Sequence, residues 1–326
     1  MNLDFTTPIN RKGTASLKWQ RYEQQDVIPM WVADMDLASP PAVQQVIANA
    51  ANRGVFGYGE VPQSLVQAFV DWCAHQYDWT VKPEWLVWLP GVVPGFNLAV
   101  EAWLKPDEGL LVQTPVYPPI RVLGKVRHRP VVDVPVSLTT TELASSLQSQ
   151  TKALLLCNPQ NPTGKVYSRE ELQQLVALAE AKDLLVISDE IWADLVLEPG
   201  LRHHPFASIS EAAAQRSVTL MAPSKTFNIA GLSCAVAVIP NPELRATYQQ
   251  FMRGLMPDMN YLGLLAADAA WQEGHAWLEG LKQHLNANLD LLENWLRDFP
   301  QIGYVRPQST FVAWLNVMAL EMEDPT

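Results

Sequence analysis

Several features are scarce in this chain of 326 residues, and each scarcity argues against a class of protein. Its three cysteines, Cys73, Cys157 and Cys234, lie far apart and form no CxxC pair, so we expect no disulfide framework and a reducing, cytoplasmic setting. The first twenty residues contain no apolar core of a secretory signal. The apolar, uncharged stretch at residues 85–100 is short and is broken by proline and glycine, so we expect no membrane span.

Positive charge is also scarce. The chain has 23 Lys plus Arg against 34 Asp plus Glu, which gives a formal charge of −11. A protein that binds the backbone of nucleic acids normally carries a basic patch or stripe, so we expect no nucleic-acid partner. Metal ligands are few as well: the pair His203-His204 has no third ligand at a suitable spacing, and we expect no metal.

What the sequence does contain is a regular alternation of short apolar runs and helical patterns. This alternation is typical of β-α-β units, and it predicts an α/β fold with a mostly parallel sheet flanked by helices. Ser168 and Glu171 form a capping box before a predicted helix at 169–182, and Pro94 suits the first position of another helix. The predicted strands are residues 86–89, 110–113, 131–134, 153–157, 184–188, 218–221 and 234–239.

The two ends of the chain differ from the middle. Residues 1–40 have no clear periodicity and are expected to form an N-terminal arm. Residues 41–275 are expected to form one large domain, and residues 276–326 to begin a second, smaller α/β domain. Within the last segment, residues 310–315 (TFVAWL) are predicted to be a strand. Because the sequence stops shortly after this strand, the smaller domain is expected to be incomplete.

Polar residues follow five of the predicted strands directly. In open α/β sheets ligands bind beyond the carboxyl ends of the strands, so these residues are expected to converge on one pocket. The clusters are Gly91-Val92-Val93-Pro94, Thr114-Pro115-Val116-Tyr117, the run from Asn158 to Gly164, Asp189-Glu190, and Ser224-Lys225.

The chemistry of these clusters suits one cofactor. A helix that begins near Gly91 offers backbone N–H groups to a phosphate. Tyr117 offers an aromatic face and Asn161 offers an amide, while Asp189 places a carboxylate at the end of a buried strand, where an unpaired charge is costly. Lys225 offers an amine. Pyridoxal 5′-phosphate (PLP) combines a phosphate, a flat ring, a cationic ring nitrogen and an aldehyde, and therefore matches this set of residues.

The motifs around these residues resemble a known family. The runs CNPQNPTGKV, SDEI and APSKTFNIAGL occur in the order typical of PLP enzymes of the aminotransferase class I/II superfamily, fold type I. The strings RKGTASLKW, PMWVADMD, GVFGYG, LPGVVPGF and PDMNYLGLLAADAAW are similar to the MalY/PatB-type C–S lyases, the cystathionine β-lyase-like branch. The resemblance runs from about residue 4 to residue 317.

This resemblance implies a role for each residue. Lys225 would bind PLP covalently and then act as the catalytic base, and Asp189 would pair with the ring nitrogen. Tyr117 would stack on the ring and Asn161 would bind its 3-oxygen. Val92, Val93 and Ser224 would hold the phosphate. Tyr58 would reach the phosphate of a neighbouring subunit, which implies a homodimer with shared active sites.

The resemblance also implies a reaction, namely cleavage of cystathionine or a related cysteine S-conjugate to a thiol, pyruvate and ammonia. Two departures from the common aminotransferase pattern are Trp192 in place of a tyrosine and Ser233 in place of an arginine. An arginine for the substrate carboxylate normally follows in the segment beyond residue 326. Two alternatives therefore remain, an aminotransferase and a PLP-binding protein that is catalytically impaired and serves as an interaction or regulatory partner.

Overall fold

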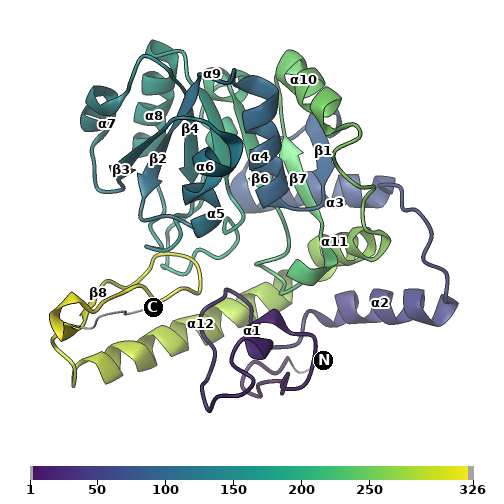
Figure 1. Ribbon diagram of the computed structural model, residues 1–326. Helices are drawn as coiled ribbons and strands as arrows, with labels where there is room; N and C mark the ends of the chain where they lie inside the picture. The colour runs from purple at the N-terminus through teal and green to yellow at the C-terminus, as the bar shows by residue number, and fades with distance from the viewer. Residues whose placement is uncertain (1–2, 322–326) are drawn as a thin grey trace.

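The computed structural model describes residues 3–321 and places a seven-stranded sheet between two layers of helices (Figure 1). The strands of this sheet lie in the order β1-β7-β6-β5-β4-β2-β3. Only β7 runs antiparallel to its neighbours, so the expectation of a mostly parallel sheet is confirmed. The strands are β1 (Leu86–Leu89), β2 (Gly109–Thr114), β3 (Val131–Pro135), β4 (Thr151–Cys157), β5 (Leu185–Asp189), β6 (Ser217–Met221) and β7 (Ala235–Val238).

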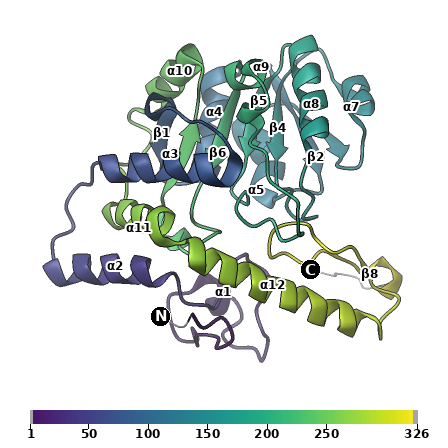
Figure 2. The same cartoon turned by 180° about the vertical axis from the view of Figure 1, so that it is seen from behind.

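Helices cover both faces of the sheet because its strands carry apolar side chains on both sides. The front face in Figure 1 packs against α4, α6 and α10, and the back face, seen in Figure 2, packs against α3, α8 and α11. The helices are α1 (Leu17–Gln20), α2 (Pro41–Arg53), α3 (Gln63–Tyr77), α4 (Val92–Trp103), α5 (Pro118–Arg121), α6 (Leu123–Arg127), α7 (Thr140–Ser146), α8 (Arg169–Ala181), α9 (Glu211–Gln215), α10 (Pro242–Met252), α11 (Tyr261–Glu273) and α12 (His275–Leu296), with 3-10 turns at Pro83–Trp85, Phe206–Ser208, Ala230–Leu232 and Met318–Leu320.

Most predicted elements are confirmed. All seven predicted strands are present in the one sheet, with ends that differ by at most two residues. Helix α8 begins with the predicted capping box, in which the hydroxyl of Ser168 accepts from the N–H of Glu171 and the Glu171 carboxylate accepts from the N–H of Ser168. The prediction that this helix, α4, begins at Pro94 was wrong, because it begins at Val92. Proline is tolerated throughout the first turn, where N–H groups have no partner within the helix.

The predicted strand at 310–315 was also wrong. Only Leu315–Asn316 form a strand, β9, which pairs with β8 (Gly303–Tyr304) in a separate two-stranded sheet. Thr310 has a φ of 74°, which interrupts an extended chain, and its N–H donates to the carbonyl of Leu195. The segment therefore attaches to the larger part of the molecule through an isolated β-bridge between Val196 and Ser309 and several hydrogen bonds around it, and not through a strand ladder.

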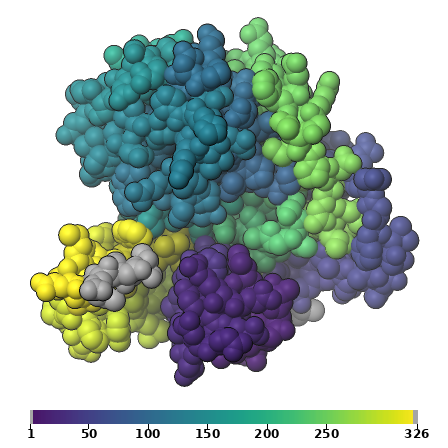
Figure 3. All heavy atoms as spheres, in the orientation of Figure 1, coloured from purple at the N-terminus to yellow at the C-terminus, as the bar shows by residue number. Residues whose placement is uncertain are grey.

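The N-terminal segment lies beside α12, on one side of the part that contains the sheet (Figure 1 and Figure 3). Residues 3–40 contain only the short helix α1, as expected for an arm. No helix within residues 3–321 is long and apolar enough to cross a membrane. The division at residues 40 and 275 stays a prediction, and residues 322–326 at the end of the last predicted segment lie outside the described residues.

Candidate functional site

The five polar clusters lie at one edge of the large sheet. Strands β1, β2, β4, β5 and β6 all run in the same direction, so their carboxyl ends meet there. The chain order reverses between β2 and β4, and such a switch point is where open α/β sheets bind ligands. Backbone and side-chain hydrogen bonds connect the loops, since the N–H of Asn158 donates to Asp189 O at 3.0 Å and Nε2 of Gln160 donates to Pro115 O at 2.5 Å.

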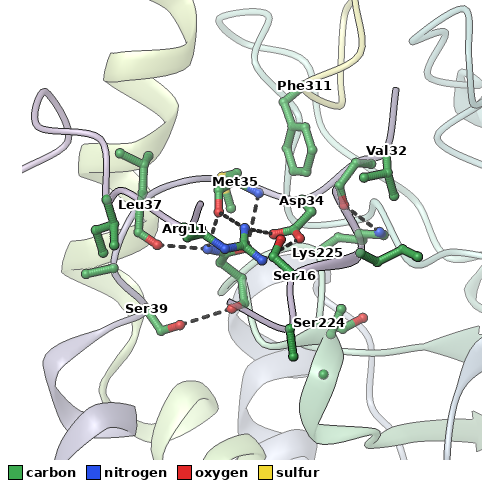
Figure 4. Close-up of a pocket in the computed structure, with 18 of the residues that line it drawn as sticks. Arg11, Ser16, Val32, Asp34, Met35, Leu37, Ser39, Ser224, Lys225 and Phe311 are labelled. Carbon is green, nitrogen blue, oxygen red and sulfur yellow. Dashed lines mark hydrogen bonds and ion pairs between the residues drawn. The ribbon is translucent and has the colours of Figure 1, made fainter. Parts of the chain in front are cut away.

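Lys225 lies in the loop after β6 and points toward the N-terminal segment. Its Nζ donates a 2.8 Å hydrogen bond to the carbonyl oxygen of Ala33 (Figure 4). The same nitrogen lies 5.8 Å from the ring centroid of Trp192. Burial lowers the pKa of the Lys225 amine, while the negative charges of Asp34 and Asp189 oppose that change. A lower pKa enlarges the neutral fraction of the amine, which is the form that acts as a nucleophile or base.

Asp189 is the last residue of β5, and 3% of its surface is exposed. Burial raises the pKa of this carboxyl to about 7, although the N–H of Ile191 donates to Oδ1 at 3.2 Å. Within residues 3–321 Asp189 forms no ion pair. A buried carboxylate without a cationic partner is unfavourable, so this position favours a ligand that brings a positive charge.

Tyr117 and Asn161 follow β2 and β4, the two strands beside the switch point. The side chain of Tyr117 is 37% exposed. Burial and the charge of Asp189 raise the pKa of its phenol, which indicates that these two side chains share one environment. Asn161 is partly buried in the loop after β4. The side chain of Gln160 in this loop donates a hydrogen bond to Pro115 O. These positions agree with the predicted convergence on one edge of the sheet.

The predicted phosphate site lies at the start of α4. Val92 and Val93 are the first two residues of this helix, which has no acidic residue in its first turn. The N–H groups of a first helical turn lack intrahelical partners, and the helix dipole favours an anion there. Ser224 precedes Lys225, and both residues line a cavity beside the N-terminal segment (Figure 4).

Tyr58 lies apart from the other predicted residues. It belongs to the loop between α2 and α3 and is 94% exposed. Its neighbours Val55 and Phe56 are exposed as well. Within a single chain Tyr58 therefore contributes nothing to the site around Lys225.

A cavity of about 740 Å³ adjoins Lys225 on the side of the N-terminal segment. Segments 9–17 and 32–39 form one wall, and residues 224–231 form the opposite wall. Arg11 is the only arginine that lines the cavity in the described part of the chain, and both of its terminal nitrogens donate to Asp34, at 2.8 and 2.9 Å. Arg11 is therefore already occupied by an internal ion pair.

Two polar groups near Lys225 received no role from the sequence. Asn228 binds the backbone of Met35 and Leu37 and accepts from the Ser39 hydroxyl. Asp194 accepts a hydrogen bond from Thr226. Asp34 and Asp36, in the string PMWVADMD, had no assigned chemistry and prove to bind Arg11 and Lys18. These four residues bind partners that are distant in sequence or are backbone atoms. The only sequence signal that pointed to them was therefore their position in or near motifs that resemble the family.

Comparison with known proteins identifies the family. The sequence pattern of "Aminotransferase class I and II" matches residues 25–324. The chain belongs to this family. Among similar proteins, cystathionine β-lyase PatB of Bacillus subtilis is 34% identical over 336 residues, which cover 99% of this chain and 87% of PatB.

Solved structures of similar proteins agree in fold. A crystal structure of OvoB is 41% identical, with a TM-score of 0.95 over 99% of this chain and 87% of that one. The PLP-bound C–S lyase from Staphylococcus hominis is 29% identical, with a TM-score of 0.92 over 99% of this chain and 86% of that one. The predicted fold type and the predicted resemblance are therefore confirmed.

Proposed function

We propose that this member of the aminotransferase family is a PLP-dependent C–S β-lyase. In this function, cystathionine or a related cysteine S-conjugate reacts with water to give a thiol, pyruvate and ammonia. The observation that carries the proposal is the pair formed by a buried carboxylate without a cationic partner, Asp189, and a desolvated amine, Lys225, at the same edge of the sheet. The printed names of PatB and of the S. hominis enzyme support this reaction.

The residues of the chain fit PLP. The Asp189 carboxylate would bind the ring nitrogen, and a positive charge at that nitrogen would relieve the unfavourable burial. Tyr117 would lie against the ring, and Asn161 would donate to its 3-oxygen. The N–H groups of Val92 and Val93, with the hydroxyl of Ser224, would bind the phosphate. PLP, when bound, supplies an aldehyde that joins amines and a ring that withdraws electrons from the substrate.

The protein's own contribution is to position groups and to move one proton. The neutral amine of Lys225 would take the proton from the α-carbon of the amino acid, which its lowered pKa favours. Trp192, which is buried and packs edge-on against Phe311, would limit the movement of the Lys225 side chain. The carboxylate of Asp189 would keep the ring nitrogen positively charged, and so maintain the withdrawal of electrons from the α-carbon.

The assembly that we propose is a homodimer in which Tyr58 completes the site of the partner. Exposed apolar side chains gathered in one loop usually mark a contact surface, and Val55, Phe56 and Tyr58 form such a group. The compartment that we propose is the cytoplasm, because Cys73, Cys157 and Cys234 are buried free thiols.

Incubation of the purified protein with cystathionine and PLP, in the absence of any oxo-acid, tests the function. We expect catalytic release of pyruvate, and the loss of this activity in the variant Lys225→Ala. Amino-group transfer that requires an oxo-acid would instead indicate an aminotransferase. A protein that binds PLP and yields neither product would indicate a catalytically impaired binding protein.

A further inference from the structure

Asn228 makes most of the hydrogen bonds that join the loop carrying Lys225 to the N-terminal segment. Its Nδ2 donates to the carbonyl oxygens of Met35 and Leu37, at 3.0 and 2.8 Å. Its Oδ1 accepts from the N–H of Met35 at 3.3 Å. The carbonyl of Asn228 also accepts from the Ser39 hydroxyl at 3.0 Å. Four hydrogen bonds therefore connect a residue three positions after Lys225 to residues 35–39, almost 190 positions earlier in the sequence.

The same segment is held from its other side by charged residues. Arg11 binds both carboxylate oxygens of Asp34 (Figure 4). Lys18 donates to Asp34 O and to Oδ2 of Asp36. Residues 33–39 are thus enclosed between residues 11–18 on one side and Asn228 on the other. The charged contacts join the segment only to other N-terminal residues. Within residues 3–321, the hydrogen bonds between this segment and the Lys225 loop all involve Asn228, apart from the single contact of Lys225 Nζ with Ala33 O.

This arrangement fixes an acceptor for the Lys225 amine. The carbonyl of Ala33 precedes the held residues directly, and its oxygen lies 2.8 Å from Nζ. A lysine side chain loses much rotamer freedom when it is fixed, and one hydrogen bond to a rigid carbonyl offsets part of that loss. A proton-transfer group must be held in place to act efficiently. A mobile Ala33 carbonyl would provide no such restraint.

We infer that Asn228 is a positioning residue for the reaction, which holds residues 33–39 so that the Ala33 carbonyl receives and orients the free amine of Lys225. This inference rests on the proposed function, because it assumes that Lys225 carries the proton. Asn228 touches neither the substrate nor Nζ, and acts through the backbone of the N-terminal segment.

Two substitutions at the same position separate this role from simple loss of a side chain. Asn228 has a φ of 56°, in the left-handed region that glycine adopts freely. Asn228→Gly therefore removes the amide without adding backbone strain. Asn228→Asp tolerates the same φ and retains an acceptor for Met35 N–H, but it loses both donors and sets a carboxylate against two carbonyl oxygens. We expect kcat to decrease in the order wild type, Asn228→Gly, Asn228→Asp. A role limited to stability predicts instead that Asn228→Asp is the milder change.

The first measurement uses the protein without cofactor. In Asn228→Gly, we expect hydrogen exchange at the Met35 amide to rise about tenfold. We also expect the midpoint for labelling of Lys225 by trinitrobenzenesulfonate to move to higher pH, because water that reaches the amine removes the burial that lowers its pKa. Asn286→Ala is the matched control, since Asn286 also donates to two carbonyl oxygens but lies in α12, away from the cavity. Unchanged exchange and labelling in Asn228→Gly would overturn the inference.

The second measurement uses the loaded enzyme. We expect kcat to fall about tenfold in Asn228→Gly with KM within about twofold, and to fall further in Asn228→Asp. If the Asp variant does not fold, Ser39→Ala should give a smaller loss in the same direction. Equal kcat in wild type and Asn228→Gly would overturn the inference. If PLP does not attach to Lys225 in the wild-type protein, the proposed function fails. The hydrogen-exchange and lysine-labelling measurements still decide whether the Asn228 contacts hold the segment.

Discussion

Oδ2 of Asp194 accepts a 2.7 Å hydrogen bond from the hydroxyl of Thr226, the residue that follows Lys225. The other oxygen of this buried carboxylate accepts from Nε1 of Trp72, at 2.9 Å, and from the hydroxyl of Tyr77. One carboxylate thus connects the loop after β6 to helix α3. Because the group is buried, each donor that it loses leaves negative charge uncompensated.

The first prediction concerns this contact. Thr226→Val keeps the shape of the side chain and removes the donor, so we expect the free energy of unfolding to fall by about 1–3 kcal/mol in urea titrations. Thr247→Val is the control, because the Thr247 hydroxyl lies exposed on α10 and donates to Glu243 O within its own helix. The control should change stability by less than about 0.5 kcal/mol. If the two substitutions lowered the free energy of unfolding equally, the contact of Thr226 with Asp194 would contribute no more to stability than an exposed hydrogen bond.

The second prediction concerns the stability of the cofactor-free protein at different pH values. The pKa of Asp189 is about 7 in the folded chain, against an ordinary value of 3.8. A raised carboxyl pKa destabilises the fold at high pH. The penalty is absent below about pH 4, grows between pH 4 and 7, and is complete above pH 7, where three pKa units correspond to roughly 4 kcal/mol.

Asp189→Asn should therefore stabilise the cofactor-free protein at pH 8, and by much less at pH 5. Urea titrations at the two pH values measure the difference. Addition of PLP should stabilise the wild type more than the variant at pH 8, because the variant offers no charge to the ring nitrogen. An Asn variant that is less stable than wild type at pH 8 would contradict the assignment of Asp189 as a carboxylate that needs a ligand.

The strands of the large sheet were easier to predict from the sequence than the segments around the sheet. The seven strands were predictable because they are buried on both faces and read as continuous apolar runs. The positions of Asp189, Lys225 and Asn161 followed from the rule that parallel strands end at one edge. Residues 310–315 (TFVAWL) form a nearly continuous apolar run, as a buried strand does, yet the positive φ of Thr310 and its bond to Leu195 depend on tertiary contacts that no local pattern shows.

The N-terminal wall of the site was not predictable in the same way. Asn228 and Lys225 bind backbone atoms of residues 33–37, about 190 positions away. Backbone partners leave no side-chain pattern, so their pairing cannot be read from residue types. The motif PMWVADMD indicated that the segment mattered, and the structure supplies the reason.

The third prediction concerns the shared sites of the proposed homodimer. Tyr58→Ala should weaken binding of PLP phosphate, and Lys225→Ala should abolish turnover. When the two variants are unfolded together and refolded at equal amounts, half of the dimers should be mixed, and each mixed dimer has one intact site. We expect about a quarter of wild-type activity. Activity no higher than that of the Tyr58→Ala subunits alone would indicate that the sites are not shared.

The most direct test of the central claim is reduction of the PLP-loaded protein with borohydride, followed by peptide mapping. The account predicts that the cofactor is fixed on Lys225, and that Lys225→Ala carries none. Attachment of the cofactor to another lysine, or a wild-type protein that remains colourless and unlabelled at saturating PLP, would contradict it.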